Sequence, residues 1–116
     1  MILVAVDDLM FASKIRAAAA AIATPVVFAK SPDDLLERAR AERPSLVIFD
    51  LNSHKLQPLA TLRRLRAEPS LADVRAIGFV SHVQTELIRA ARDAGTTEVL
   101  ARSAFSKNIG DILRTA

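Results

Sequence analysis

Acidic residues follow two short apolar stretches of this chain. Asp7 and Asp8 come directly after the apolar residues 2–6, and Asp50 ends the run Leu46–Asp50. Four apolar residues in a row are typical of a strand that is buried on both faces of a sheet. Because open parallel sheets bind ligands at the carboxyl ends of their strands, these carboxylates are candidates for a ligand site.

Ser81 and Arg102 follow two further apolar stretches, residues 76–80 and 98–101. Carboxylates gathered in one cleft repel one another, and they stay ionised beside a hard divalent cation or a fixed positive charge. A carboxylate next to Mg²⁺ can attack phosphorus as a nucleophile, while a hydroxyl and a cation hold the oxygens of the transferred group. The residue types therefore suit phosphoryl chemistry, with Ser81 and Arg102 as the hydroxyl and the cation.

Five apolar stretches alternate along the chain with five helical patterns. The strands are predicted at residues 2–6, 26–29, 46–50, 76–80 and 98–101. Apolar residues at helical spacing predict helices over residues 10–23, 32–42, 59–65, 83–94 and 105–113. Ser31 before Pro32 is a helix start, and Gly95 stands where a helix ends in the left-handed conformation.

Alternating strands and helices predict an α/β fold with a parallel sheet, helices on both faces and right-handed crossovers. The usual solution at this size is the flavodoxin-like strand order 2-1-3-4-5, which places the first and third strands side by side. That order brings the three acids to one edge of the sheet, next to a wall that carries Ser81 and Arg102.

Length and composition exclude several classes of protein. The 116 residues form one domain, 1–116, with 51% hydrophobic and 25% charged residues, which is typical of a globular chain. There is no cysteine for disulfides or thiol catalysis, and the two histidines leave little for a zinc site. We expect a soluble, cytoplasmic protein that does not bind membranes or nucleic acid. The net charge of +3 is expected to reflect a solvated basic surface that includes Arg63, Arg64 and Arg66.

On these residues the chain resembles, over essentially its full length, the CheY-like receiver domains of two-component response regulators. The resemblance rests on the acid pair Asp7-Asp8, on Asp50, on Ser81 and on the fivefold alternation. It implies that Asp50 is the phosphoacceptor, that Asp8 and more indirectly Asp7 hold Mg²⁺, and that Asn52 offers its backbone carbonyl to the metal. It also implies that Ser81 binds the phosphoryl group and moves as the protein switches.

Several positions depart from the family pattern. Arg102, followed by Ser103, stands where receivers usually have Lys and Pro, and His82 replaces a small residue after the hydroxyl position. Val99 stands at the usual aromatic switch position. We expect Arg102 to face the acids, although its planar guanidinium differs from a compact ammonium, and His82 to modulate access to the phosphate. By this comparison the chain is an atypical receiver.

The resemblance favours a stand-alone receiver that takes a phosphoryl group on Asp50 from a histidine kinase or a phosphotransfer protein and acts through a downstream target protein. It would be no enzyme beyond its own phosphorylation and dephosphorylation, and homodimer formation stays open. The alternative is a pseudo-receiver that binds partners without phosphorylation. A third, remote alternative is a small phosphatase, because Asp50 and Asn52 stand in a Phe-Asp-Leu-Asn stretch similar to the nucleophile loop of haloacid-dehalogenase-like enzymes.

Overall fold

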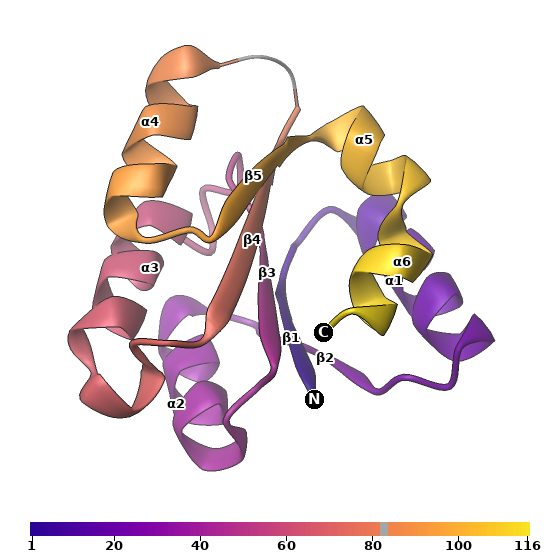
Figure 1. Ribbon diagram of the computed structural model, residues 1–116, viewed down its shortest axis with the longest axis horizontal. Helices are drawn as coiled ribbons and strands as arrows, with labels where there is room; N and C mark the ends of the chain where they lie inside the picture. Colours follow the sequence, from indigo (N-terminus) through magenta and orange to yellow (C-terminus); the bar gives the residue numbers. More distant parts are fainter. Residues whose placement is uncertain (82–83) are drawn as a thin grey trace.

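A five-stranded parallel sheet forms the centre of the computed structural model, which describes residues 1–81 and 84–116 (Figure 1). The elements follow one another as β1 (Ile2–Ala5), α1 (Leu9–Ala21), β2 (Val26–Phe28), α2 (Pro32–Glu42), β3 (Leu46–Asp50), α3 (Pro58–Ala67), the 3₁₀ turn η1 (Pro69–Leu71), β4 (Arg75–Val80), α4 (Thr85–Ala94), β5 (Glu98–Ala101), α5 (Arg102–Lys107) and α6 (Ile109–Arg114). The strand order is β2-β1-β3-β4-β5, which confirms the predicted flavodoxin-like topology.

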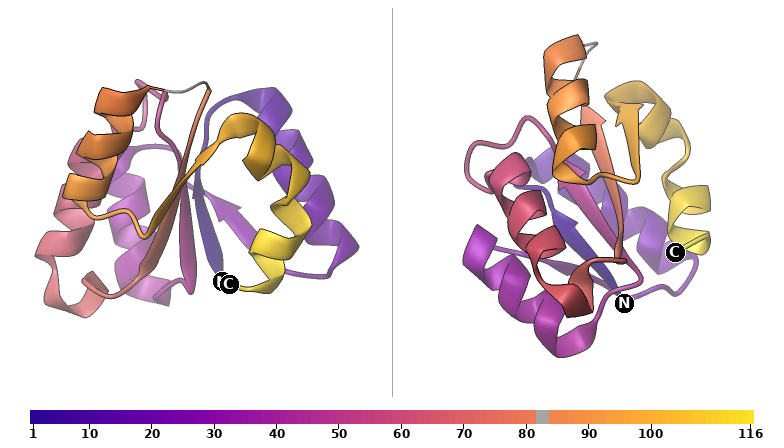
Figure 2. Two further views of the ribbon diagram at one scale, coloured as in Figure 1. Left: turned by 45° about the horizontal axis from the view of Figure 1, so that its top comes forward. Right: turned by 60° about the vertical axis from the view of Figure 1, so that its left-hand side comes forward.

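Helices cover both faces of the sheet. Figure 2 shows α2, α3 and α4 on one face and α1, α5 and α6 on the other. Side chains alternate along β1, so that Leu3 and Ala5 belong to the core under the first group of helices, and Ile2 and Val4 to the core under the second. The central strands β1, β3 and β4 are therefore buried on both sides, whereas the edge strands β2 and β5 are partly exposed.

The predicted helix boundaries rest on local signals that the structure confirms. The Ser31 hydroxyl accepts a hydrogen bond from the Asp34 N–H at 3.0 Å and caps α2. Gly95 ends α4 with φ of 115°, a conformation that other residues rarely adopt. An added Cβ at this glycine would lie 2.6 Å from Cγ of Arg66, so the site has no room for a side chain either.

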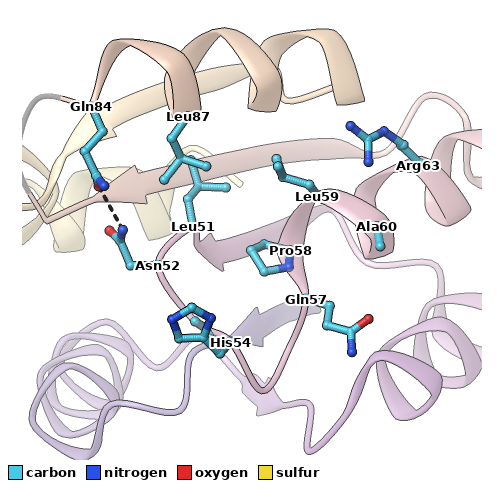
Figure 3. Close-up of a pocket in the computed structure, with 11 residues that line it drawn as sticks. Leu51, Asn52, His54, Gln57, Pro58, Leu59, Ala60, Arg63, Gln84 and Leu87 are labelled. Atoms are coloured by element: carbon cyan, nitrogen blue, oxygen red, sulfur yellow. Dashed lines mark hydrogen bonds between the residues drawn. The ribbon is translucent and has the colours of Figure 1, made fainter.

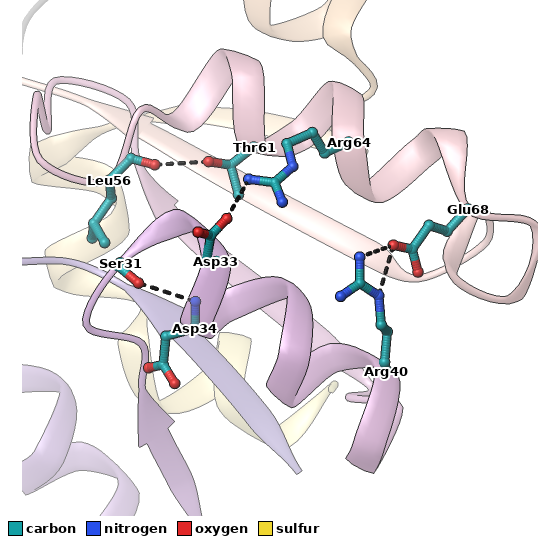
Figure 4. Close-up of polar contacts among 8 residues, drawn as sticks. All are labelled: Ser31, Asp33, Asp34, Arg40, Leu56, Thr61, Arg64 and Glu68. Atoms are coloured by element: carbon teal, nitrogen blue, oxygen red, sulfur yellow. Dashed lines mark hydrogen bonds and ion pairs between the residues drawn. The ribbon is translucent and has the colours of Figure 1, made fainter.

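Polar contacts fix α3 against its neighbours (Figure 4). The Arg64 guanidinium pairs with Asp33 of α2 at 2.9 Å, and Arg40 of α2 pairs with Glu68 at the other end of α3. The Thr61 hydroxyl donates to the Leu56 carbonyl at 2.8 Å. The ion pairs join α2 and α3, and the Thr61 contact joins α3 to the loop that follows Asp50.

Arg66 corrects the expectation of a solvated arginine face on α3. Its guanidinium lies in a partly buried position and donates to the carbonyls of Gly95 at 2.9 Å, Ala72 at 2.9 Å and Val74 at 2.5 Å. Burial lowers the pKa of this group, and the nearby Asp73 opposes that effect. Helical spacing alone could not reveal this role, because the three carbonyls belong to segments after α3.

The single helix expected over residues 105–113 is also wrong, because the structure has two short helices, α5 and α6, that meet at Asn108. The Asn108 backbone leaves the helical region with φ of −116° and ψ of 15°, and its side-chain Nδ2 donates to the Ala104 carbonyl at 2.8 Å. An asparagine that bonds to nearby backbone competes with helix continuation. The apolar spacing runs on across this break and therefore could not show it.

Candidate functional site

An open cleft lies at the carboxyl ends of β1 and β3. Its lining comprises acidic, polar and basic residues, namely Asp7, Asp8, Asp50, Asn52, Ser53, His54, Lys55 and Arg102. The structure thus brings the three acids and Arg102 to one edge of the sheet, as the strand order predicts. Among the described residues, no helix combines the length and apolar composition needed to cross a membrane.

Asp50 is the buried acid of this cleft. Its residue is 7% exposed, and its Oδ1 accepts a hydrogen bond from the Asn52 N–H at 2.9 Å. Burial raises the pKa of Asp50 above its ordinary value, and the negative charges of Asp7 and Asp8 add to the rise, while the Asn52 N–H and the Arg102 charge oppose it. The Asn52 N–H thus helps to fix the orientation of the carboxylate.

Asp8 has partners for both of its carboxylate oxygens. Oδ1 accepts the Phe11 N–H at 3.0 Å and caps α1, and Oδ2 accepts a hydrogen bond from Nη2 of Arg102 at 2.6 Å. The Phe11 N–H and the Arg102 guanidinium lower the pKa of Asp8. Asp8 is therefore held as a carboxylate by the helix start and by an ion pair.

Arg102 is held by an aromatic ring as well as by Asp8. Its guanidinium carbon lies 4.2 Å from the centroid of the Phe11 ring, within the range of a cation–π contact. Phe11 stacks on Phe79 with centroids 5.0 Å apart, and Phe79 stacks on Phe105 at 4.6 Å. Arg102, the first residue of α5, thus faces the acids as predicted, and a buried aromatic column supports it.

Ser53 is a site residue that the sequence reasoning missed. It is buried, and its hydroxyl donates to Oδ1 of Asp7 at 2.8 Å and accepts the Leu56 N–H at 3.2 Å. Asp7 itself is exposed. A serine in a loop carries no pattern that announces such a contact, because the distance depends on how the loop after β3 folds back over β1.

Asn52 connects the loop after β3 with the loop after β4. Its side-chain Oδ1 accepts the Ser81 N–H at 2.8 Å, and its Nδ2 donates to Oε1 of Gln84 at 2.8 Å (Figure 3). Ser81 directly follows β4 and lies at an exposed position beside this contact. Gln84 was not among the predicted site residues, and His82, predicted to modulate access, lies outside the described residues.

A shallow groove lies beside the Asn52–Gln84 contact, between the β3–α3 loop, α3 and α4 (Figure 3). Apolar side chains form part of its lining, with polar groups that include His54, Gln57 and Arg63. His54 is exposed, as the sequence suggested. The groove borders the acidic cleft, since Asn52, Ser53 and His54 line both.

The donor types at the cleft suit a hard divalent cation, which takes carboxylate and carbonyl oxygens. Their present arrangement is less suited to it, because Asp8 is paired with Arg102 and Asp7 bonds to Ser53. Within residues 1–81 and 84–116, no group of three acidic or histidine side chains is arranged to hold a metal ion. Mg²⁺ therefore fits the chemistry of the residues, and a cation bound at Oδ2 of Asp8 would compete with Arg102 for that oxygen.

Comparison with known proteins yields one curated relative and many structural matches. No protein-family model matches the chain. The transcriptional activator protein ExaE of Pseudomonas putida is 36% identical over 80 residues, which are 69% of this chain and 36% of that protein. The chain thus matches about a third of the length of this relative.

Solved structures of response regulators match nearly the whole chain. A putative response regulator from Chloroflexus aurantiacus has a TM-score of 0.85 at 17% identity, covering 98% of this chain and 93% of that one. The phosphorylated cyanobacterial phytochrome response regulator RcpA has a TM-score of 0.81 at 20% identity, and the match covers 98% of this chain and 88% of that one. The Mn²⁺-bound response regulator Rcp1 has a TM-score of 0.81 at 14% identity, and the match covers 96% of this chain and 89% of that one. With this topology and these matches, the chain has the fold of a CheY-like receiver domain of response regulators.

Proposed function

We propose that this chain is a receiver domain in which Asp50 accepts a phosphoryl group from a histidine kinase or a phosphotransfer protein. The observation that carries the proposal is the position of Asp50, buried at the carboxyl end of the central strand and lining an open cleft that holds two further acids and a cation. RcpA, which shares the fold, was solved in a phosphorylated state.

The chemistry follows from the contacts of Asp50. The Asn52 N–H orients the carboxylate through Oδ1, and Oδ2 attacks the phosphorus of a phosphohistidine donor. A new P–O bond forms as the P–N bond breaks, and the imidazole leaves with the bonding electron pair. Hydrolysis of the resulting acyl phosphate returns the free carboxylate. Burial favours the reaction geometry by limiting the positions that the carboxylate can take.

Mg²⁺ is the cofactor proposed for this reaction, and Rcp1 of the same fold was solved with Mn²⁺. Asp7, Asp8, Asp50 and the backbone carbonyl of Asn52 are the residues that would hold it. When bound, the metal offsets negative charge on the transferred group. Arg102 and Ser81 are the residues of this chain that would contact the phosphoryl oxygens.

The proposed function also has a cellular side: the chain would be a signalling module that acts in the cytoplasm through a downstream target protein. Its only catalysis would be its own phosphorylation and dephosphorylation at Asp50. ExaE, the curated relative, is described as a transcriptional activator, but it is far longer than the matched segment. The target of this chain therefore has to be found by experiment, starting from the phosphorylated form.

Phosphoryl uptake tests the proposal directly. The protein is incubated with Mg²⁺ and a small phosphodonor such as phosphoramidate, and the intact mass is measured. We expect the mass of one phosphoryl group on the wild type and on the control Asp93→Asn, whose exposed acid lies on α4. Asp50→Asn should take up none, and uptake by that variant would refute the assignment of the acceptor.

A second candidate function is an interaction module that does not become phosphorylated. One observation favours it, namely the Arg102–Asp8 ion pair, which occupies an oxygen that a metal would need. Under this hypothesis the wild type folds normally but takes up no phosphoryl group at any metal concentration. The same mass measurement therefore separates the two functions.

A further inference from the structure

In the ion pair between Asp8 and Arg102, the guanidinium donates to one oxygen of the Asp8 carboxylate, Oδ2. Oδ1 of Asp8 is committed to the start of α1, where it accepts the Phe11 N–H at 3.0 Å. Oδ2 accepts Nη2 of Arg102 at 2.6 Å. Oδ2 is the Asp8 oxygen that the helix cap does not use, so a metal ion that bound there would compete with the guanidinium.

The guanidinium is not easily displaced. It lies 4.2 Å from the Phe11 ring centroid, and Phe11 is only 5% exposed and is stacked on Phe79. The Arg102 and Asp8 side chains are 31% and 35% exposed, so the pair is only partly accessible to water.

We infer that Arg102 competes with the divalent cation for Oδ2 of Asp8 and thereby lowers the affinity of this domain for Mg²⁺. The inference rests on the metal site of the proposed function and adds a regulatory contact to it. Metal binding at Oδ2 moves Arg102 from Asp8, and the released guanidinium can then turn to the phosphoryl group. Loading of the metal and repositioning of Arg102 are thus one event.

The test compares Mg²⁺ binding by calorimetry in the wild type, Arg102→Gln and Arg64→Gln. The last variant is a matched control, because Arg64 forms an arginine–aspartate pair with Asp33, away from the cleft, and its loss changes the net charge equally. We expect Arg102→Gln to bind Mg²⁺ about tenfold more tightly than the wild type, the scale of one partly exposed ion pair and one cation–π contact. Arg64→Gln should change the affinity by less than about twofold.

A second measurement on the wild type separates displacement from simple charge repulsion. The side-chain NMR signals of the Arg102 guanidinium are followed during the Mg²⁺ titration. Displacement predicts that these signals shift and exchange faster with water as the metal site fills. If Mg²⁺ binds while they stay unchanged, Arg102 does not leave Asp8 and the inference is wrong.

The remaining outcomes are also decisive. Equal affinities of the wild type and Arg102→Gln would overturn the competition and leave the proposed phosphoacceptor standing. Binding by neither protein would overturn the metal site itself, and with it both the competition and the role of Mg²⁺ in the proposed function. Phosphoryl uptake by Asp50 is measured separately, so the two failures are distinguishable.

Discussion

At the scale of single residues, Asp50 differs from the other acids of the cleft because its carboxylate is buried, and burial disfavours a negative charge. Asp7 is exposed and Asp8 is paired with Arg102, whereas Asp50 is 7% exposed and its carboxylate accepts the Asn52 N–H. Burial is the main reason that its pKa is raised. A carboxylate that is poorly solvated in the folded protein destabilises the fold and is a more available nucleophile.

The pH dependence of Asp50→Asn follows from the sign of this shift. Because the folded-state pKa is raised, the stability that Asp50 contributes is present below its unfolded pKa and is lost as the pH rises through the folded pKa. At about pH 7 we therefore expect Asp50→Asn to raise the free energy of unfolding by about 1 kcal/mol, with a smaller gain at about pH 3. Urea denaturation at both pH values measures the difference.

Asp93→Asn is the control for this experiment, since Asp93 is exposed. It should leave the free energy of unfolding unchanged at both pH values. If Asp50→Asn is destabilising at neutral pH, the carboxylate is better compensated than its burial indicates, and the interpretation of Asp50 as a poorly solvated acid is wrong.

At the scale of elements, Arg66 joins α3 to the segments that follow it and to the end of α4. Its guanidinium bonds to the carbonyls of Ala72, Val74 and Gly95. The close approach of its stem to Gly95 explains why that position has no side chain. Arg66 thus adds polar contacts at the end of α4 to the apolar packing of α3 beside α4.

Replacement of Arg66 by methionine tests this role. Methionine keeps the apolar stem but leaves partly buried carbonyls without a donor, and we expect a loss of about 2 kcal/mol in the free energy of unfolding. Arg63→Met, at an exposed position on the same helix, should stay within about 0.5 kcal/mol of the wild type. A loss of equal size in both variants would mean that charge on α3, and not the carbonyl contacts, stabilises the fold.

At the scale of the whole molecule, the acidic cleft is connected to both helical layers. Asp8 and Arg102 connect it to α1 and α5 on one face of the sheet, and Asn52 connects it through Gln84 to the start of α4 on the other (Figure 2). A ligand at Asp50 can therefore affect both layers. The two connections differ in kind, since one is an ion pair and the other a pair of neutral hydrogen bonds.

Asn52→Ala should interrupt the connection to α4. After addition of Mg²⁺ and beryllofluoride, a mimic of the phosphoryl group, we expect backbone amide shifts at Asp50, Arg102 and Gln84 in the wild type. In Asn52→Ala the shift at Gln84 should be reduced while that at Arg102 persists, because only the hydrogen bonds to Ser81 and Gln84 are lost. The exposed neighbour His54→Ala is the control, and equal shifts at Gln84 in all three proteins would contradict the connection.

The sequence by itself determined the architecture and the composition of the cleft. Apolar stretches followed by Asp7 and Asp8, by Ser81, or ending in Asp50 predict strands. The alternation of these strands with helices predicts a parallel sheet, in which the carboxyl ends of the strands lie at one edge. The start of α2 at Ser31 and the end of α4 at Gly95 are likewise determined by local sequence signals. Such features are encoded within a few residues and need no knowledge of distant contacts.

The tertiary structure alone decided which partners these side chains have. Asp8 pairs with Arg102, which is 94 positions away, and Asp7 with Ser53, which is 46 positions away. Arg66 reaches three carbonyls instead of solvent, and Asn52 reaches Ser81 and Gln84. These contacts depend on the packing of side chains from separate segments within a few ångströms, and a one-dimensional pattern does not contain those distances. Whether the acids are available to a metal is consequently a property of the fold.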